Sequence, residues 1–193
     1  YDVRLDESLR RWNADAEVTV QQVIADHLGE GQVFWDVGAN FGLHSILGAK
    51  LVGESGRVLA AEPVPYNLRL LKRNIHLNKI GQIVRVLPSA IGATPSPEME
   101  MTIEEGLSVA AHLGSAGPGT TIKVPVTTLD SLVTESERPP TFIKIDVEGA
   151  EHEVIKGARE MLLKHRPVLL IEVHRFALPD FGSSSEEFSE LLL

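Results

Sequence analysis

The chain has 193 residues and no cysteine, which excludes disulfide bonds, a thiol nucleophile and a cysteine-ligated zinc site. Its 18 basic and 27 acidic side chains give a formal net charge of −9, which argues against nucleic acid or an anionic membrane as the main partner. The length suits one α/β domain, and no apolar stretch approaches the length of a membrane span. We therefore expect residues 1–193 to form a single domain located in the cytoplasm.

The first part of the chain predicts helices followed by a strand and a glycine loop. Residues 1–31 carry apolar side chains at helical spacing and are expected to be an N-terminal helical segment. Residues 33–37 are an apolar run typical of a strand buried on both faces. Gly38 and Gly42 then mark a tight turn, after which helical spacing resumes. Strand, glycine loop and helix form the opening unit of a nucleotide-binding α/β fold, whose ligand lies beyond the carboxyl end of the strand.

The residues of this loop indicate which nucleotide it favours. Asn40 stands in place of the middle glycine of a dinucleotide fingerprint, and the carboxylate of Asp36 lies just ahead of the loop. A carboxylate repels phosphate but attracts an ammonium or a sulfonium group. S-adenosylmethionine carries both of these cations and no phosphate. The loop therefore favours a methyl donor, and an NAD(P)-dependent oxidoreductase is the less favoured alternative.

The next two predicted strands also end on polar residues. The second ends on Glu62, about 20 residues beyond the glycine loop, where a ribose-binding carboxylate is expected in such folds. The third is followed by Ser89 and Ala90, whose position suits contact with adenine. Residues 92–127 are then rich in Gly, Pro, Ser and Thr and predict a β-hairpin insertion. Such an insertion either covers the substrate or decorates the surface.

Two further apolar strands carry the remaining acids. Asp146 and Glu148 follow the first of them, and the second contains Glu172 and ends at His174. The β–α alternation implies parallel strands, whose carboxyl ends meet at one edge of the sheet. We therefore expect one shared rim containing Asp36, Glu62, Ser89, Asp146, Glu148, Glu172 and His174. A rim so rich in carboxylates suits a cationic cofactor.

The same rim offers groups that can accept a proton. His174 is the best-tuned candidate for a general base because its unperturbed pKa lies near neutrality, and a carboxylate is the other choice. A histidine hydrogen-bonded to the backbone at a strand end is the simpler explanation of the same residue. Asp146, Glu148, Glu172 and His174 could also hold a divalent cation. Nothing in their spacing is specific for a metal, and we do not predict a required one.

Taken together, the motifs resemble one known family. Their order along the chain is Phe34–Gly42, Ala61–Asn67, Asn74–Asn78, Thr128–Asp130, Ile143–Glu151 and Ile171–His174. Over residues 17–176 this set is similar to the FkbM-family S-adenosylmethionine-dependent methyltransferases. The resemblance implies a Rossmann-like class I methyltransferase fold with a doubly wound, mostly parallel sheet. It also implies O-methylation of a small-molecule hydroxyl, on a sugar or a natural product.

The resemblance further implies roles for individual residues. Asp36, Gly38, Asn40 and Gly42 would hold the methionine part of the cofactor, Glu62 the ribose, and Ser89 with Ala90 the adenine. Asp146 and Glu148 would lie near the transferred methyl group. With Glu172 and His174, these two acids form the predicted catalytic set.

The chain departs from the family after His174, where too few residues remain for the last two strands of the fold. An open sheet edge is prone to pair with another chain. We therefore expect either a truncated chain or an oligomer that completes the sheet. The missing C-terminal strands favour one alternative function. In this alternative the chain has the methyltransferase fold but no catalytic activity, and serves as a binding or assembly module. The sequence does not identify the methyl acceptor.

Overall fold

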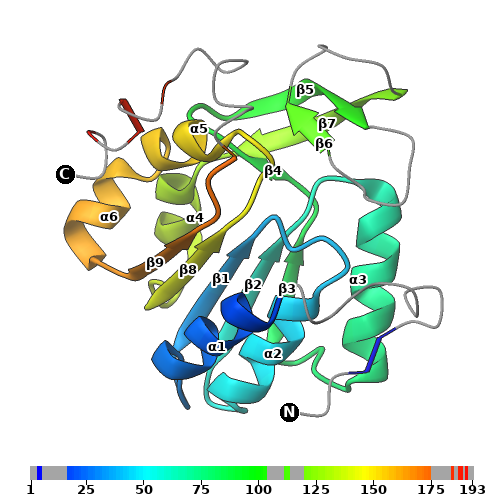
Figure 1. Cartoon of the computed structure of the whole chain (residues 1–193), viewed down its shortest axis with the longest axis vertical. Coiled ribbons are helices and arrows are strands. Elements are labelled where there is room, and N and C mark those ends of the chain that lie inside the picture. The colour runs from blue at the N-terminus through cyan, green and yellow to red at the C-terminus, as the bar shows by residue number, and fades with distance from the viewer. Residues whose placement is uncertain are drawn as a thin grey trace.

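The computed structural model describes residues 4–5, 17–103, 111–113, 120–174, 184, 187–188 and 190. Most of the helix expected before residue 17 lies outside these ranges. The main sheet has five parallel strands in the order β3-β2-β1-β8-β9 (Figure 1). The bounds are β1 (Val33–Val37), β2 (Arg57–Ala61), β3 (Val84–Leu87), β8 (Phe142–Ile145) and β9 (Val168–Ile171). This architecture confirms the predicted parallel α/β sheet.

Helices cover both faces of the main sheet. One apolar core lies between one face and α1 (Val18–His27), α2 (Leu43–Val52) and α3 (Pro65–Leu77). A second core lies between the other face and α4 (Leu129–Glu135), α5 (Glu151–Lys156) and α6 (Arg159–His165). The residues of β1 alternate between the two cores, with Phe34 in the first and Trp35 in the second. The central strand is therefore buried on both sides, as its continuous apolar run predicts.

A small second sheet lies beyond the end of the main one (Figure 1). Its strand order is β4-β7-β5-β6, with bounds β4 (Ala90–Ile91), β5 (Ser96–Ile103), β6 (Ala111–Leu113) and β7 (Thr120–Thr127). The long strands β5 and β7 pair antiparallel within the segment expected to be an insertion. Their buried side chains pack with Val64, which directly precedes α3. This contact fixes the second sheet over the carboxyl ends of the parallel strands.

The outer edge of the main sheet is formed by β9. Within the described ranges β9 pairs only with β8, and Val168 at its start is 44% exposed. Near the C-terminus, Phe188 is buried in the second core, with its ring against that of His152. Association of chains through this edge remains a prediction. Across the same described ranges, every helix is too short or too polar to cross a membrane.

The glycine loop after β1 differs from expectation in what Gly42 accommodates. Gly42 precedes α2 with a φ of 92°, a backbone conformation that favours glycine. A Cβ at this position would lie 2.4 Å from Cδ1 of Leu71 in α3. The sequence interpretation left this space for the close approach of a helix and of the ligand; the structure shows a helix side chain there, and the contact with a ligand stays a prediction. Gly42 therefore serves the packing of α2 against α3.

We predict that Gly42→Ala lowers the free energy of unfolding by about 1–3 kcal/mol, because the new Cβ meets both backbone strain and Leu71. Urea denaturation of the purified chain measures this change. Gly81→Ala is the matched control, since its Cβ would meet only Ile75, at 4.0 Å, and should change stability by less than about 0.5 kcal/mol. Equal stability of the two variants would contradict this explanation of Gly42.

Candidate active site

A cavity of about 620 Å³ opens at the carboxyl ends of the parallel strands, beneath the second sheet. Concave sites that combine apolar surface with a few polar groups are where small molecules and cofactors commonly bind. The described residues that line it are Val37, Gly38, Asn40, Ala61, Glu62, Pro63, Val64, Asn67, Ser89, Ala90, Ile91, Met101, Asp146, Val147 and Glu148. The structure thus brings together five of the predicted cofactor residues and two of the predicted catalytic acids.

Gly38 lets two of the loops around the cavity meet. Its φ is 82°, and a Cβ would lie 1.8 Å from the carbonyl oxygen of Asp146. Only a residue without a side chain fits this approach. The loop after β1 and the loop after β8 are therefore in direct backbone contact, and both line the cavity.

Glu62 is almost fully buried at the end of β2, where three donors hold its carboxylate. The backbone N–H of Asn40 donates to Oε2 at 2.9 Å, and the backbone N–H of Val64 donates to Oε1 at 2.8 Å. The side-chain amide of Asn67 also donates to Oε1, at 3.2 Å. Burial raises the pKa of Glu62, and these three hydrogen bonds act in the opposite direction. Because a carboxylate can accept about four hydrogen bonds, acceptor capacity remains on Oε2.

Asn67 is a cavity residue to which the sequence interpretation gave no role. It is 2% exposed, and its Oδ1 has no hydrogen-bond partner among the described residues. The contact with Glu62 fixes the orientation of the amide, since only the nitrogen can donate to a carboxylate. Oδ1 is thus an unsatisfied buried acceptor in the cavity wall. The sequence did contain a sign of this role: Asn67 is a polar residue at helical spacing from Leu71 and Ile75, on the buried face of α3.

Ser89 and Ala90 belong to a less polar part of the wall. The hydroxyl of Ser89 points to two carbonyl oxygens, at 2.9 Å from that of Pro125 and 3.0 Å from that of Ala90. Its donor is therefore directed to the backbone of the second sheet. Ala90, Ile91 and Met101 continue the lining with apolar surface. This section of the cavity suits a flat apolar group such as a purine ring.

Asp36 lies outside the cavity lining, although it was expected to contact the cofactor. Its side chain is fully buried and faces α2, where the hydroxyl of Ser45 donates to Oδ2 at 2.5 Å. The ammonium of Lys144 lies 3.8 Å from Oδ1 of Asp36 and 3.0 Å from Oδ2 of Asp146. The expected contact between Asp36 and a methionine group stays a prediction, which this placement does not favour.

Lys144 is a second residue that the sequence interpretation missed. Burial lowers the pKa of its ammonium, but the carboxylates of Asp36 and Asp146 outweigh this effect, so the pKa is raised. Burial raises the pKa of Asp36, while Lys144 and Ser45 favour its ionised form. Two carboxylates stabilise the charged form of Lys144, whereas the two carboxylates share a single ammonium group between them. We therefore take Lys144 as charged. The sequence feature that could have indicated this role is a lysine within the otherwise apolar, buried strand β8.

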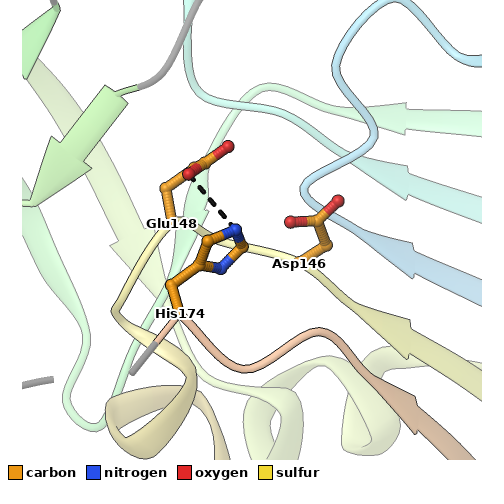
Figure 2. Close-up of side chains that lie close together, drawn as sticks. All are labelled: Asp146, Glu148 and His174. Atoms are coloured by element: carbon orange, nitrogen blue, oxygen red, sulfur yellow. Dashed lines mark ion pairs between the residues drawn. The ribbon is translucent and has the colours of Figure 1, made fainter. Parts of the chain in front are cut away.

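The loop after β8 turns Asp146 and Glu148 toward His174 (Figure 2). Glu148 has a φ of 54°, which is uncommon for a residue with a side chain and is often found at functional sites. Its Oε2 lies 3.4 Å from Nε2 of His174, while Oε1 of Glu151 lies 3.0 Å from Nδ1. Glu172 is half exposed, with Oε1 3.9 Å from Nε2, and neither Glu172 nor His174 is among the described residues that line the cavity. The structure therefore groups His174 with all the predicted catalytic acids and adds Glu151.

Three of these residues could also hold a metal ion. Asp146, Glu148 and His174 each offer one ligand atom, and these atoms lie within 4.8 Å of one another. Oxygen and nitrogen donors of this kind suit several divalent cations. The ammonium of Lys144 opposes such a site, because it already contacts Oδ2 of Asp146. The arrangement is thus compatible with a metal but does not require one.

Solved structures of other proteins share this architecture. The chain aligns with precorrin-6y C5,15-methyltransferase from Geobacter metallireducens at a TM-score of 0.55 and 17% identity, covering 98% of this chain and 76% of that one. It aligns with a SAM-dependent methyltransferase from Aquifex aeolicus at a TM-score of 0.52 and 18% identity, covering 98% and 87%. At these identities the likeness shows the fold alone, which is the Rossmann-like fold of class I methyltransferases.

The family follows from the sequence comparisons. Residues 36–193 match the methyltransferase FkbM domain, and the chain belongs to this family. It is 31% identical over 161 residues to the hexuronic acid methyltransferase AglP of Haloferax volcanii. That match covers 82% of this chain and 62% of the relative, so the chain spans less than two thirds of the relative's length. The predicted family is therefore confirmed.

We predict that Lys144→Met lowers the free energy of unfolding by about 3–5 kcal/mol, because it leaves the buried carboxylate of Asp36 without its cation. The double variant Asp36→Asn with Lys144→Met should recover part of this loss. Urea denaturation measures all three chains. Lys156→Met, which removes an exposed pair with Glu153, is the control and should lose less than about 1 kcal/mol. Similar losses for the two lysines would contradict the importance assigned to Lys144.

Proposed function

We propose that this chain is an S-adenosylmethionine-dependent methyltransferase that methylates a hydroxyl group of a small molecule, such as a sugar. One observation carries the proposal. The cavity at the strand ends is lined by three carboxylates, of Glu62, Asp146 and Glu148, and no lysine or arginine is among its described lining residues. Such a wall attracts the ammonium and sulfonium groups of the methyl donor. Family membership supplies the methyltransferase context.

The cavity offers a place for each part of this cofactor. The methionine part would lie against the backbone of Gly38 and Asn40, close to Asp146. The ribose hydroxyls would donate to Glu62 and to Oδ1 of Asn67, which has no other partner among the described residues. The adenine would lie on the apolar section at Ala90. This assignment satisfies an acceptor that is otherwise buried without a hydrogen bond.

The same wall disfavours the dinucleotide alternative. A pyrophosphate at the glycine loop would face the carboxylates of Glu62 and Asp146, and among the described lining residues no cation offsets them. Dinucleotide sites instead place the pyrophosphate on backbone N–H groups at a helix N-terminus, away from acids. We therefore do not favour an NAD(P)-dependent oxidoreductase.

Methyl transfer needs an acceptor oxygen in line with the methyl carbon and the sulfur. In the proposed step the oxygen–carbon bond forms, the carbon–sulfur bond breaks, and the electron pair of the broken bond stays on sulfur. The hydroxyl proton passes to Nε2 of His174, which lies beside Glu148. Asp146 and Glu148 line the cavity and would orient the acceptor hydroxyl.

The environment of His174 suits a proton acceptor. Burial lowers the pKa of His174, but the hydrogen bond to Glu151 and the charges of Glu148 and Asp146 outweigh burial, so the pKa is raised. A raised pKa makes the imidazolium that forms during transfer more stable. It also requires the ring to lose a proton before each turnover. The reaction rate should therefore rise with pH until the ring is neutral.

The acceptor class rests on the relative in Haloferax volcanii, whose name states that it methylates a hexuronic acid. A sugar hydroxyl is a poor nucleophile unless its proton is removed, which fits a site with a base. The second sheet lines the cavity through Met101, in the section assigned above to the adenine, so the acceptor would lie on the side of Asp146 and Glu148.

Isothermal titration calorimetry with S-adenosylmethionine and with NADH tests the cofactor. We expect saturable binding of the methyl donor and none of NADH. Transfer of a labelled methyl group to a panel of neutral sugars and uronic acids then tests the reaction. Absence of cofactor binding by the folded chain would contradict the proposal. Cofactor binding without transfer to any acceptor would favour the degenerate binding module.

We predict that Asn67→Ala weakens binding of S-adenosylhomocysteine by about 3–10-fold, the effect of one lost hydrogen bond. The analogue that lacks the ribose 2′-hydroxyl separates this contact from damage to the fold. Wild type should bind the analogue more weakly than the parent compound, whereas the variant should bind the two alike if Oδ1 accepts from the 2′-hydroxyl. Calorimetry of each protein with each ligand measures the coupling between the Asn67 side chain and the 2′-hydroxyl. An equal preference for the parent compound in both proteins would contradict this contact.

A further inference from the structure

Glu151 is a buried carboxylate that the fold alone does not explain. An acid in the first turn of α5 interacts favourably with the helix dipole, and this accounts for Glu153. Glu153 is partly exposed and pairs with Lys156 at 2.8 Å. Glu151 stands in the same turn but is 0% exposed, inside the protein. Burial of a carboxylate is unfavourable unless its partners compensate for the lost water.

The partners of Glu151 lie at the active site. Its Oε1 accepts the backbone N–H of Gly149 at 3.0 Å and lies 3.0 Å from Nδ1 of His174. Its Oε2 has no hydrogen-bond partner among the described residues. The carboxylate is therefore only partly satisfied, and one of its contacts is to the histidine. Gly149 belongs to the loop that carries Glu148, so Glu151 fixes that loop and the imidazole together.

The contact determines which nitrogen of His174 carries the proton. An ionised carboxylate only accepts, so Nδ1 must be the donor in this pair. In the neutral ring the lone pair then lies on Nε2, the nitrogen that faces Glu148 at 3.4 Å. In serine hydrolases a buried carboxylate acts in the same way: it fixes the tautomer of the base and stabilises the imidazolium without itself taking the proton.

We propose that Glu151 is the positioning residue for the base of this enzyme: it holds the Nδ1–H group of His174 and keeps Nε2 turned toward Glu148, which lines the cavity. This inference rests on the proposed methyl transfer. The proton of the acceptor hydroxyl moves to Nε2 of His174 as the oxygen–methyl bond forms. In this step Glu151 acts only as the acceptor of the Nδ1–H group and does not carry the transferred proton.

Among the described residues, charged groups from four places face His174. Glu151 belongs to α5, Glu148 to the loop before it, Asp146 to the end of β8, and Glu172 to the residue after β9. Lys144 lies behind Asp146 and offsets its charge. Glu151 contributes both a hydrogen bond and a charge to the raised pKa of His174. Glu151→Gln keeps an oxygen that can accept from Nδ1 and removes the charge, so the pKa of His174 should fall.

Two measurements on the full chain test this role. NMR of the chain with isotope-labelled histidine gives the pKa and the tautomer of His174, with Glu153→Gln as the matched control in the same turn. The dependence of kcat on pH, at saturating S-adenosylmethionine and with the acceptor found in the sugar panel, gives the catalytic effect. Calorimetry with S-adenosylhomocysteine shows whether each variant keeps its fold and cofactor site.

We expect Glu151→Gln to lower the pKa of His174 from its raised value toward the ordinary 6.5 and to move the rising limb of the pH profile to lower pH. Glu151→Ala also removes the hydrogen bond and should lower kcat about 100-fold or more, as loss of an oriented base does. Cofactor affinity should stay within about twofold in both. Glu153→Gln should leave the pKa, the pH profile and the affinity unchanged.

An unchanged pKa of His174 in Glu151→Gln would contradict this inference, whatever the reaction proves to be. Loss of activity on chelation, with recovery on adding Mg²⁺, would also overturn it, because His174 would then act as a metal ligand. Failure of the wild-type chain to bind S-adenosylmethionine contradicts the proposed function instead. The NMR measurement needs neither cofactor nor acceptor and separates the two failures.

Discussion

The arrangement of the active site depends on a buried ammonium group, that of Lys144. This residue lies on β8, next to the central strand β1. In the parallel register Lys144 lies beside Asp36 on β1, and its side chain reaches Asp146 at the cavity. One cation thus joins the strand before the glycine loop to the acid that follows the neighbouring strand β8. Without it, the acids that gather at the strand ends would repel one another in a medium of low dielectric constant. The carboxylate-rich cavity is possible because its positive counterpart lies beneath it.

Much of this architecture could be predicted because it follows from periodicity and topology. Buried strands of apolar residues alternate with amphipathic helices, which specifies a parallel sheet, and parallel strands end at one edge. Gly38, Glu62 and Asp146 therefore meet although they are far apart in the chain. The family match over residues 36–193 agrees with the same motifs. Position along a strand was enough to place these residues at the site.

The direction and partners of a side chain were harder to predict. A strand buried on both faces gives no polar alternation, so nothing local showed that Asp36 faces α2 and not the ligand. The space at Gly42 was expected to admit a helix and a ligand, but nothing local showed that the nearest neighbour is Leu71 of α3. Glu151 lies in the first turn of α5, where an acid interacts favourably with the helix dipole, and nothing local showed its contact with His174. In each case the deciding partner comes from a distant part of the chain.

The proposed reaction moves a positive charge without changing the total charge of the site. Before transfer the charge is on the sulfonium of the cofactor and His174 is neutral; afterwards the sulfur is neutral and His174 is an imidazolium. Both positions are near Asp146 and Glu148, and Glu151 adds a carboxylate on the histidine side. The same fixed acids therefore favour the charge at its origin and at its destination. In the transition state the charge is divided between the two, so the acids need no rearrangement as it moves. This is the physical reason why a cluster of carboxylates suits a site where a cation is consumed and another is formed.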